Sequence, residues 1–171
     1  VTANDGASTA GQPNRWTDSP VISAAALAGG SLTLTGYVGS AAGQAVFAGS
    51  RVEFFLSDGD ASGFGEGRTY LGFLTADASG NFSGTLTGVT LAPGDRITAT
   101  ATDTGNNTSE FGANFALNHP PTLSNGAVVA LTGTNEDTTS TAMTVAALLA
   151  GAGWADADAG AVSGIAVTST S

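Results

Sequence analysis

Acidic side chains are the residues of this sequence best suited to chemistry, and the first group lies in a glycine-rich loop. Asp58, Asp60 and Ser62 place oxygens at the first, third and fifth positions of a calcium-loop frame, with glycine at the sixth. The twelfth position is Thr69 instead of the bidentate glutamate that completes such loops. Two interpretations stay open: a calcium site formed by Asp58, Asp60 and Glu66, or a solvent-exposed glycine loop.

A second acidic group lies near the C-terminus. Glu136, Asp137, Asp156 and Asp158 are all the charged residues of the segment 118–171. Carboxylates without a nearby cation repel one another unless a metal ion or water neutralises them. These four residues are therefore either ligands of calcium or members of ordinary solvated acidic turns.

The groups needed for nucleophilic catalysis are scarce in this sequence. It has no cysteine, no lysine, no G-x-S-x-G motif and one histidine, His119, which we expect to be exposed in a linker. Paired carboxylates could hydrolyse glycosides, but no pattern places two of them in a cleft beside aromatic residues. We therefore expect a protein that is not an enzyme.

Composition limits the partners and the location. The chain carries 14 acidic residues against 4 arginines, for a net charge of −10, so we expect no nucleic-acid binding. No run of 18 apolar residues occurs, so we expect no membrane insertion. Small polar residues replace charged ones, as in many secreted bacterial β proteins. The first residue is Val1, and we expect a fragment or a processed product.

Apolar and polar residues alternate with a period of two through much of the segment 20–117, as in half-buried strands. A first strand is expected to open at Pro20. Further strands are expected at 31–38, 51–57, 68–76 and 81–87, followed by the two arms of a hairpin within 95–117. Seven short strands separated by glycine-rich turns predict an all-β sandwich.

The hairpin carries the clearest pattern. Alternation is in phase from Ile97 through the turn at 104–107 to Phe111 and Phe115, which predicts one buried and one solvent-facing side. With Phe54 and Leu56 from the strand 51–57, these residues form the expected core.

The remaining segments flank this sandwich. Residues 1–19 have no periodicity and are expected to form a tail or a loop leading into the sandwich, with Trp16 attaching it. The consecutive Pro120 and Pro121 and a loss of aromatic residues mark a boundary before 118–171. Within that segment a short helix is expected around 145–150, capped by Thr141 or Thr144.

Four segments together resemble an immunoglobulin-like repeat of very large bacterial surface and secreted proteins. They are VEFFLS (52–57), GFGEGRTYLG (63–72), TADASGNFS (75–83) and ITATATDTGNNTSEF (97–111). The resemblance implies an immunoglobulin-like β-sandwich over 20–117.

The segment 118–171 resembles the start of a cadherin-like repeat found in the same proteins. The matching residues are PPTL (120–123), NEDT (135–138), VAALL (145–149), DADAGAV (156–162) and GIAV (164–167). The resemblance implies a partial second β module. It also implies that Glu136, Asp137, Asp156 and Asp158 share calcium at the junction between modules.

The function that these resemblances imply is a structural or adhesive repeat of a large protein, which spaces or presents other modules. They also imply an extracellular or cell-surface location. Its partners would be neighbouring repeats of the same chain or other copies of itself. One alternative is a self-assembling fibre subunit, in which the segment 1–19 adds as a strand to another copy. Another is a carbohydrate-binding module, for which Trp16, Tyr37 and Phe64 are the candidate aromatic residues.

Overall fold

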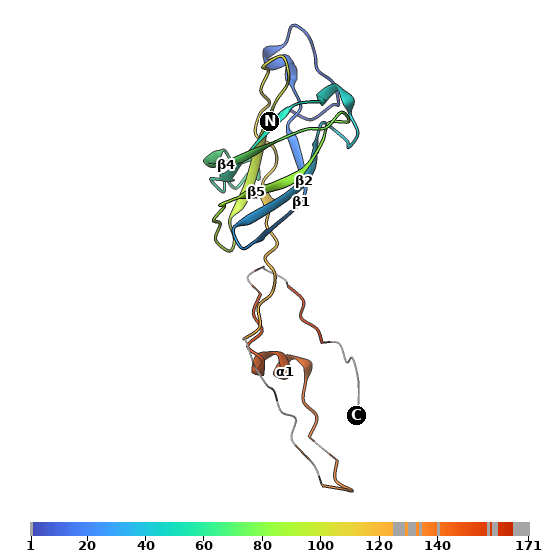
Figure 1. The fold of residues 1–171 in the computed structure, drawn as a ribbon, viewed down its shortest axis with the longest axis vertical. Helices are drawn as coiled ribbons and strands as arrows, with labels where there is room; N and C mark the ends of the chain where they lie inside the picture. The colour runs from blue at the N-terminus through green and yellow to red at the C-terminus, as the bar shows by residue number, and fades with distance from the viewer. Residues whose placement is uncertain are drawn as a thin grey trace. The chain divides into compact units, whose positions relative to one another are not determined.

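The computed structural model describes residues 2–124, 129, 133, 135–139, 141–156, 158 and 161–165. The chain divides into two compact units, Val1–Asn118 and His119–Ser171 (Figure 1). Each unit is described by itself below. No helix of the described part is long and apolar enough to cross a membrane.

The first unit is an all-β sandwich of two antiparallel sheets, as predicted. One sheet has the strand order β1-β2-β5 and the other β4-β3-β6-β7. The strands are β1 (Pro20–Ala28), β2 (Ser31–Val38), β3 (Arg51–Ser57), β4 (Gly67–Thr75), β5 (Asn81–Thr87), β6 (Arg96–Thr102) and β7 (Phe115–Ala116). β1, which opens with Pro20, lies at the edge of its sheet, where proline is tolerated; it pairs along its length with β2 and forms one isolated bridge with Asn118.

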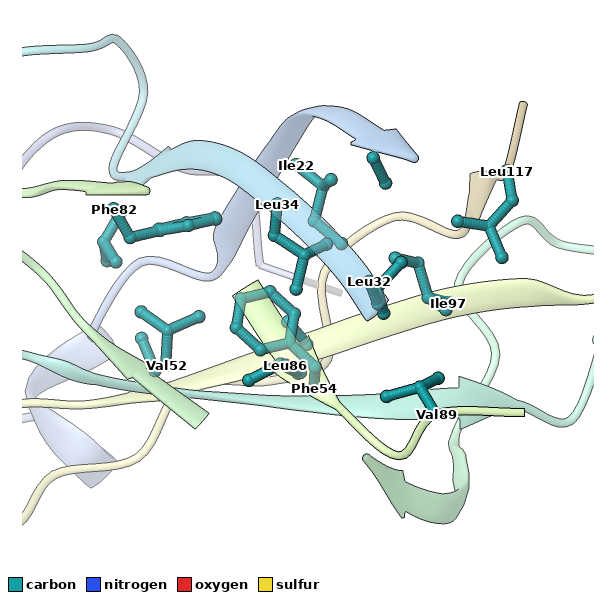
Figure 2. Packing of buried hydrophobic residues seen from close by; sticks show 14 of the residues in the cluster. Ile22, Leu32, Leu34, Val52, Phe54, Phe82, Leu86, Val89, Ile97 and Leu117 are labelled. Carbon is teal, nitrogen blue, oxygen red and sulfur yellow. The ribbon is translucent and has the colours of Figure 1, made fainter. Parts of the chain in front are cut away.

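The core lies between the two sheets, where alternate residues of facing strands meet (Figure 2). Leu32 and Leu34 from β2 and Val52 and Phe54 from β3 are fully buried, so the predicted alternation of these strands and the core position predicted for Phe54 are confirmed. The ring of Phe54 packs edge to face on the ring of Phe82, which belongs to the other sheet, with ring centroids 5.5 Å apart. Such aromatic pairs add about 0.5–1.5 kcal/mol beyond the area they bury.

Phe47 is a core residue that the sequence pattern did not predict. It lies in η2 (Ala45–Phe47), a single 3-10 turn between β2 and β3, and is 1% exposed. A lone apolar residue in an irregular segment has no neighbours from which a period can be read.

The hairpin was predicted with one solvent-facing side, and at β6 this is wrong. Thr98 and Thr100 are buried on the side opposite Ile97. The hydroxyl of Thr98 donates to the carbonyl oxygen of Gly112 at 2.8 Å, which satisfies its buried polar group. The central strand is therefore covered on both faces.

The core position predicted for Phe111 is also wrong. Its ring packs edge to face on Phe55, with centroids 5.5 Å apart, and Phe55 does not belong to the core between the sheets. The segment between Ser109 and Asn114 is not a regular strand, so the period of two does not continue through it. Leu56 and Phe115 are partly buried and pack against the core.

Polar contacts, and not Trp16, attach the N-terminal segment to the sandwich. Trp16 remains 47% exposed. The side-chain amide of Asn4 donates to the carbonyl oxygens of Ser19 (2.8 Å) and Gly39 (2.9 Å). Within the segment itself, the buried carboxylate of Asp18 accepts the backbone N–H of Gly6 at 2.7 Å and folds the segment back on itself.

The described part of the second unit contains one helix, α1 (Val145–Gly151). The predicted cap is confirmed, because the hydroxyl of Thr144 accepts the backbone N–H of Ala147 at 3.1 Å. Thr122 and Ala155 pair as an isolated antiparallel bridge.

Candidate functional site

The glycine-rich loop between β3 and β4 uses its predicted calcium ligands to shape its own backbone. Asp58 accepts the N–H of Asp60 at 3.1 Å, and Asp60 accepts the N–H of Ser62 at 2.8 Å. Hydrogen bonds from the Ser62 side chain and backbone lower the pKa of Asp60. The backbone of Glu66 closes the loop by accepting the N–H of Asp58 at 3.0 Å. These are turns of the kind that aspartate stabilises without a metal.

In the second unit, Asp158 pairs with His119. One carboxylate oxygen of Asp158 accepts the backbone N–H of His119 at 2.6 Å, and the other lies 2.9 Å from its ring Nδ1. The side-chain contact, followed by the backbone contact, lowers the pKa of Asp158. The exposure predicted for His119 is wrong, because its side chain is only 14% exposed.

The other predicted calcium ligands of this unit do not join Asp158 in a cluster. Asp156 accepts the N–H of Asp158 at 2.9 Å. Across the described ranges, no three His, Asp or Glu side chains are grouped so that they could hold a metal ion. Calcium at Glu136, Asp137, Asp156 and Asp158 stays a prediction.

A polar cavity of about 230 Å³, called here the Trp16 cavity, lies beside the N-terminal segment of the sandwich. Three segments line it: Thr2, Ala3 and Asn4; Pro13, Asn14 and Trp16 to Ser19; and Thr108, Ser109 and Glu110. Glu110 accepts the backbone N–H of Thr2, which joins the first segment to the third. The sequence signal for this site was Trp16 in an otherwise polar tail.

Asp18 forms the buried side of the Trp16 cavity. Burial raises the pKa of its carboxyl, although hydrogen bonds from the N–H groups of Gly6 and Asp5 act in the opposite direction. Its two carboxylate oxygens are thus held by the backbone of its own segment, and Asp18 shapes the site instead of offering a free base.

A larger and more apolar cavity of about 720 Å³ lies between β1 and the segment leading into β7. It is lined by Thr2, Ala3, Asn4, Ser19, Pro20, Val21, Ile22, Ser62, Phe64, Ala113, Asn114 and Phe115. Phe64 therefore lines a different cavity from Trp16, and Tyr37 lines neither. The three aromatic residues suggested for carbohydrate binding do not share one site.

The aromatic surface that does form was not predicted. It covers the outer side of β3 and β4, where Phe55 packs on Tyr70 and the Arg51 guanidinium lies 3.5 Å from the ring centroid of Phe73. Arg51 also donates to Tyr70 and forms an ion pair with Glu53. The Arg51 guanidinium is therefore already engaged by residues of this surface.

The sequence was compared with models of known protein families, and none of them matches it.

Proposed function

We propose that this chain is a structural module of a large extracellular protein, in which the sandwich acts as a spacer or a presenting unit. The supporting observation is the path of the chain through the first unit. The N-terminal segment is held at Ser19 and Gly39, where β1 begins, and Asn118 forms a parallel bridge with Ala26, near the end of β1. Seven residues of strand separate the two points, about 23 Å at 3.3 Å per residue. Because the chain enters and leaves the sandwich at points this far apart, each such module would lengthen a row of linked modules.

The pairing of the first and last strand segments suits such a load. Gly112 approaches the carbonyl oxygen of Pro20 so closely that a Cβ would lie 2.3 Å from it, and the parallel bridge of Ala26 with Asn118 lies six residues further along each segment. Force applied to the two ends would shear these segments past each other along their length. Contacts loaded in parallel resist more than contacts broken one at a time.

The outer face of the sheet β1-β2-β5 is lined by hydroxyl groups, which is a second support. Ser23 lies 3.3 Å from Thr35 and Thr33 lies 3.2 Å from Thr85, each pair joined oxygen to oxygen across neighbouring strands. Such pairs stabilise a sheet without charge or exposed apolar area. This face suits a unit that must stay soluble beside identical neighbours.

The contacts of the N-terminal segment favour the spacer over strand exchange. Asn4 donates to Gly39 and the N–H of Thr2 donates to Glu110, which binds the segment to its own sandwich, so it is not available as a strand for another copy while these bonds hold. Light scattering of the full chain should therefore give a monomer of 16.6 kDa. Polymers would favour the fibre subunit instead.

Single-molecule pulling tests the spacer itself. The chain lacks cysteine, so a cysteine added at each end gives a unique attachment. Because 114 residues separate Asn4 from Asn118, we expect one abrupt step of about 400 Å when the sandwich unfolds, at about 3.6 Å per residue. Gradual lengthening with no such step would contradict the proposal, because a spacer must keep its length under load.

A further inference from the structure

The Trp16 cavity combines an aromatic wall with a rim of groups that form hydrogen bonds. At about 230 Å³ it lies below the roughly 300–1,000 Å³ of pockets for drug-sized ligands, so it suits one small ring or one unit of a longer molecule. The indole of Trp16 is 47% exposed and offers an apolar surface. Asn14, Thr108 and Glu110 lie on the rim.

The rim offers donors and acceptors together. Among the described contacts, none engages the side-chain amide of Asn14 or the indole N–H of Trp16, and the described bond to Glu110 uses only one of its two side-chain oxygens. The amide of Asn14 both donates and accepts, the indole only donates, and the remaining oxygen of Glu110 accepts. Neighbouring hydroxyl groups on one ligand need this mixture, because each hydroxyl also donates and accepts.

Charge and polarity exclude the other classes of small ligand. No lysine or arginine lines the cavity, whereas Asp18 and Glu110 do, so an anion would be repelled. An apolar ligand would displace water from the rim without replacing its hydrogen bonds. Both carboxylates already accept backbone N–H groups, which weakens the attraction for a cation. We propose that the cavity binds one sugar unit of a neutral saccharide, with the ring against Trp16.

The backbone holds the indole in place before any ligand arrives. Asn14, Arg15 and Trp16 have φ of 46°, 52° and 49°, a left-handed run without glycine that costs on the order of 1–2 kcal/mol per residue. The run is fixed by the N–H of Thr9, which donates to the carbonyl oxygen of Arg15 at 2.7 Å, and by the hydroxyl of Thr17, which donates to Asn14. An aromatic ring fixed in advance loses little entropy on binding.

Tryptophan fluorescence of the full chain gives a direct test. The chain has two tryptophans, Trp16 and Trp154, so Trp154→Phe leaves Trp16 as the only reporter. The probes are glucose, galactose, mannose, N-acetylglucosamine and their β-linked disaccharides, with glucuronate and choline as charged comparisons. We expect a saturable change with at least one neutral sugar at about millimolar Kd, as suits a small exposed site.

Variants separate binding from folding, with calorimetry as the readout. Trp16→Ala should weaken the sugar at least tenfold, whereas Trp154→Phe should leave its affinity unchanged. Asn14→Gly relieves a positive φ while removing the amide, so it should keep or raise the melting temperature and still weaken binding. Glu110→Gln keeps a side-chain oxygen as an acceptor but removes the charge on which an organic cation would depend.

Three results would overturn the proposal. The first is a panel in which no neutral sugar gives a saturating response. The second is sugar binding that persists unchanged in Trp16→Ala. The third is saturation by choline, lost in Glu110→Gln, with no response to any neutral sugar, which would identify the cavity as a site for organic cations.

Discussion

Replacing Gly36 by alanine tests the packing of the sandwich, because strand propensity and packing predict opposite signs. Gly36 lies in the middle of β2, paired with Ile22 on one side and Phe82 on the other. Alanine in a strand interior is favoured over glycine by about 0.5–1 kcal/mol. Burying a methyl group adds about 0.8 kcal/mol more. From the sequence alone, Gly36→Ala would therefore stabilise the protein.

The structure predicts the opposite. A Cβ at Gly36 would lie 2.2 Å from the carbonyl oxygen of Val21 and 2.4 Å from Cζ of Phe82. An ordinary carbon–oxygen contact is about 3.3 Å or longer, so β1 must move by about 1 Å or Phe82 must leave its place in the core. Overpacking of this kind costs about 1–3 kcal/mol, and the upper end applies because the first obstacle is backbone. We expect a net loss of about 1–2 kcal/mol.

Gly84→Ala is the matched control, one strand away in β5. There the nearest atom to a new Cβ is Cδ2 of Leu74 at 2.6 Å, the far end of a flexible and only partly buried side chain. We expect this variant to lie within about 1 kcal/mol of the parent. Urea unfolding of the full chain, followed by far-UV circular dichroism, measures both differences. The reasoning about packing is refuted if Gly36→Ala is at least as stable as Gly84→Ala.

Three further predictions address the core, an ion pair and the metal. Phe54→Ala should lower the free energy of unfolding in urea by about 3–5 kcal/mol, because Phe54 is fully buried. Phe73→Ala, at a residue that is 45% exposed, should lower it by less than about 1 kcal/mol. Equal losses would show that the core is wrongly assigned. Contact with His119 lowers the pKa of Asp158 in the folded protein. The contact therefore stabilises the folded state at pH values above the ordinary aspartate pKa, and this stabilisation is lost as the pH falls through the lower folded value. NMR titration of the Asp158 carboxyl checks the direction, and a raised pKa would contradict it. Calcium bound by the C-terminal acids would raise the melting temperature, by an amount that grows with the logarithm of its concentration above the Kd. The rise should disappear in Asp156→Asn, and no rise at millimolar calcium would retire the site.

Strands in which apolar and polar residues alternate between two turns could be predicted with their first and last residues. The bounds of β2, β3 and β5 match the expected segments 31–38, 51–57 and 81–87, because each has a period of two and a turn at both ends. Irregular segments gave no such signal. Phe111 follows a turn whose length sets its phase, and the approach of Gly112 to Pro20 interrupts the strand just after it.

Contacts between residues far apart in the sequence also could not be predicted from the alternation of apolar and polar residues. His119 and Asp158 are separated by 39 positions, and their contact depends on the fold of the second unit. Likewise, the burial of Thr98 depends on the carbonyl of Gly112 and cannot be read from the alternation of β6. Both cases involve polar groups, whose burial is acceptable only when a partner is found elsewhere in the chain.

The N-terminal segment departs furthest from local expectation, and the departure coincides with the Trp16 cavity. Trp16 is the largest apolar residue of its segment and would ordinarily be buried, yet it is half exposed. Three consecutive residues without glycine adopt positive φ to place it there, where right-handed backbone would cost less. Sequences violate local rules mainly where function or strain demands it. The fixed position of the indole is therefore the strongest reason to look for a ligand at this end of the sandwich.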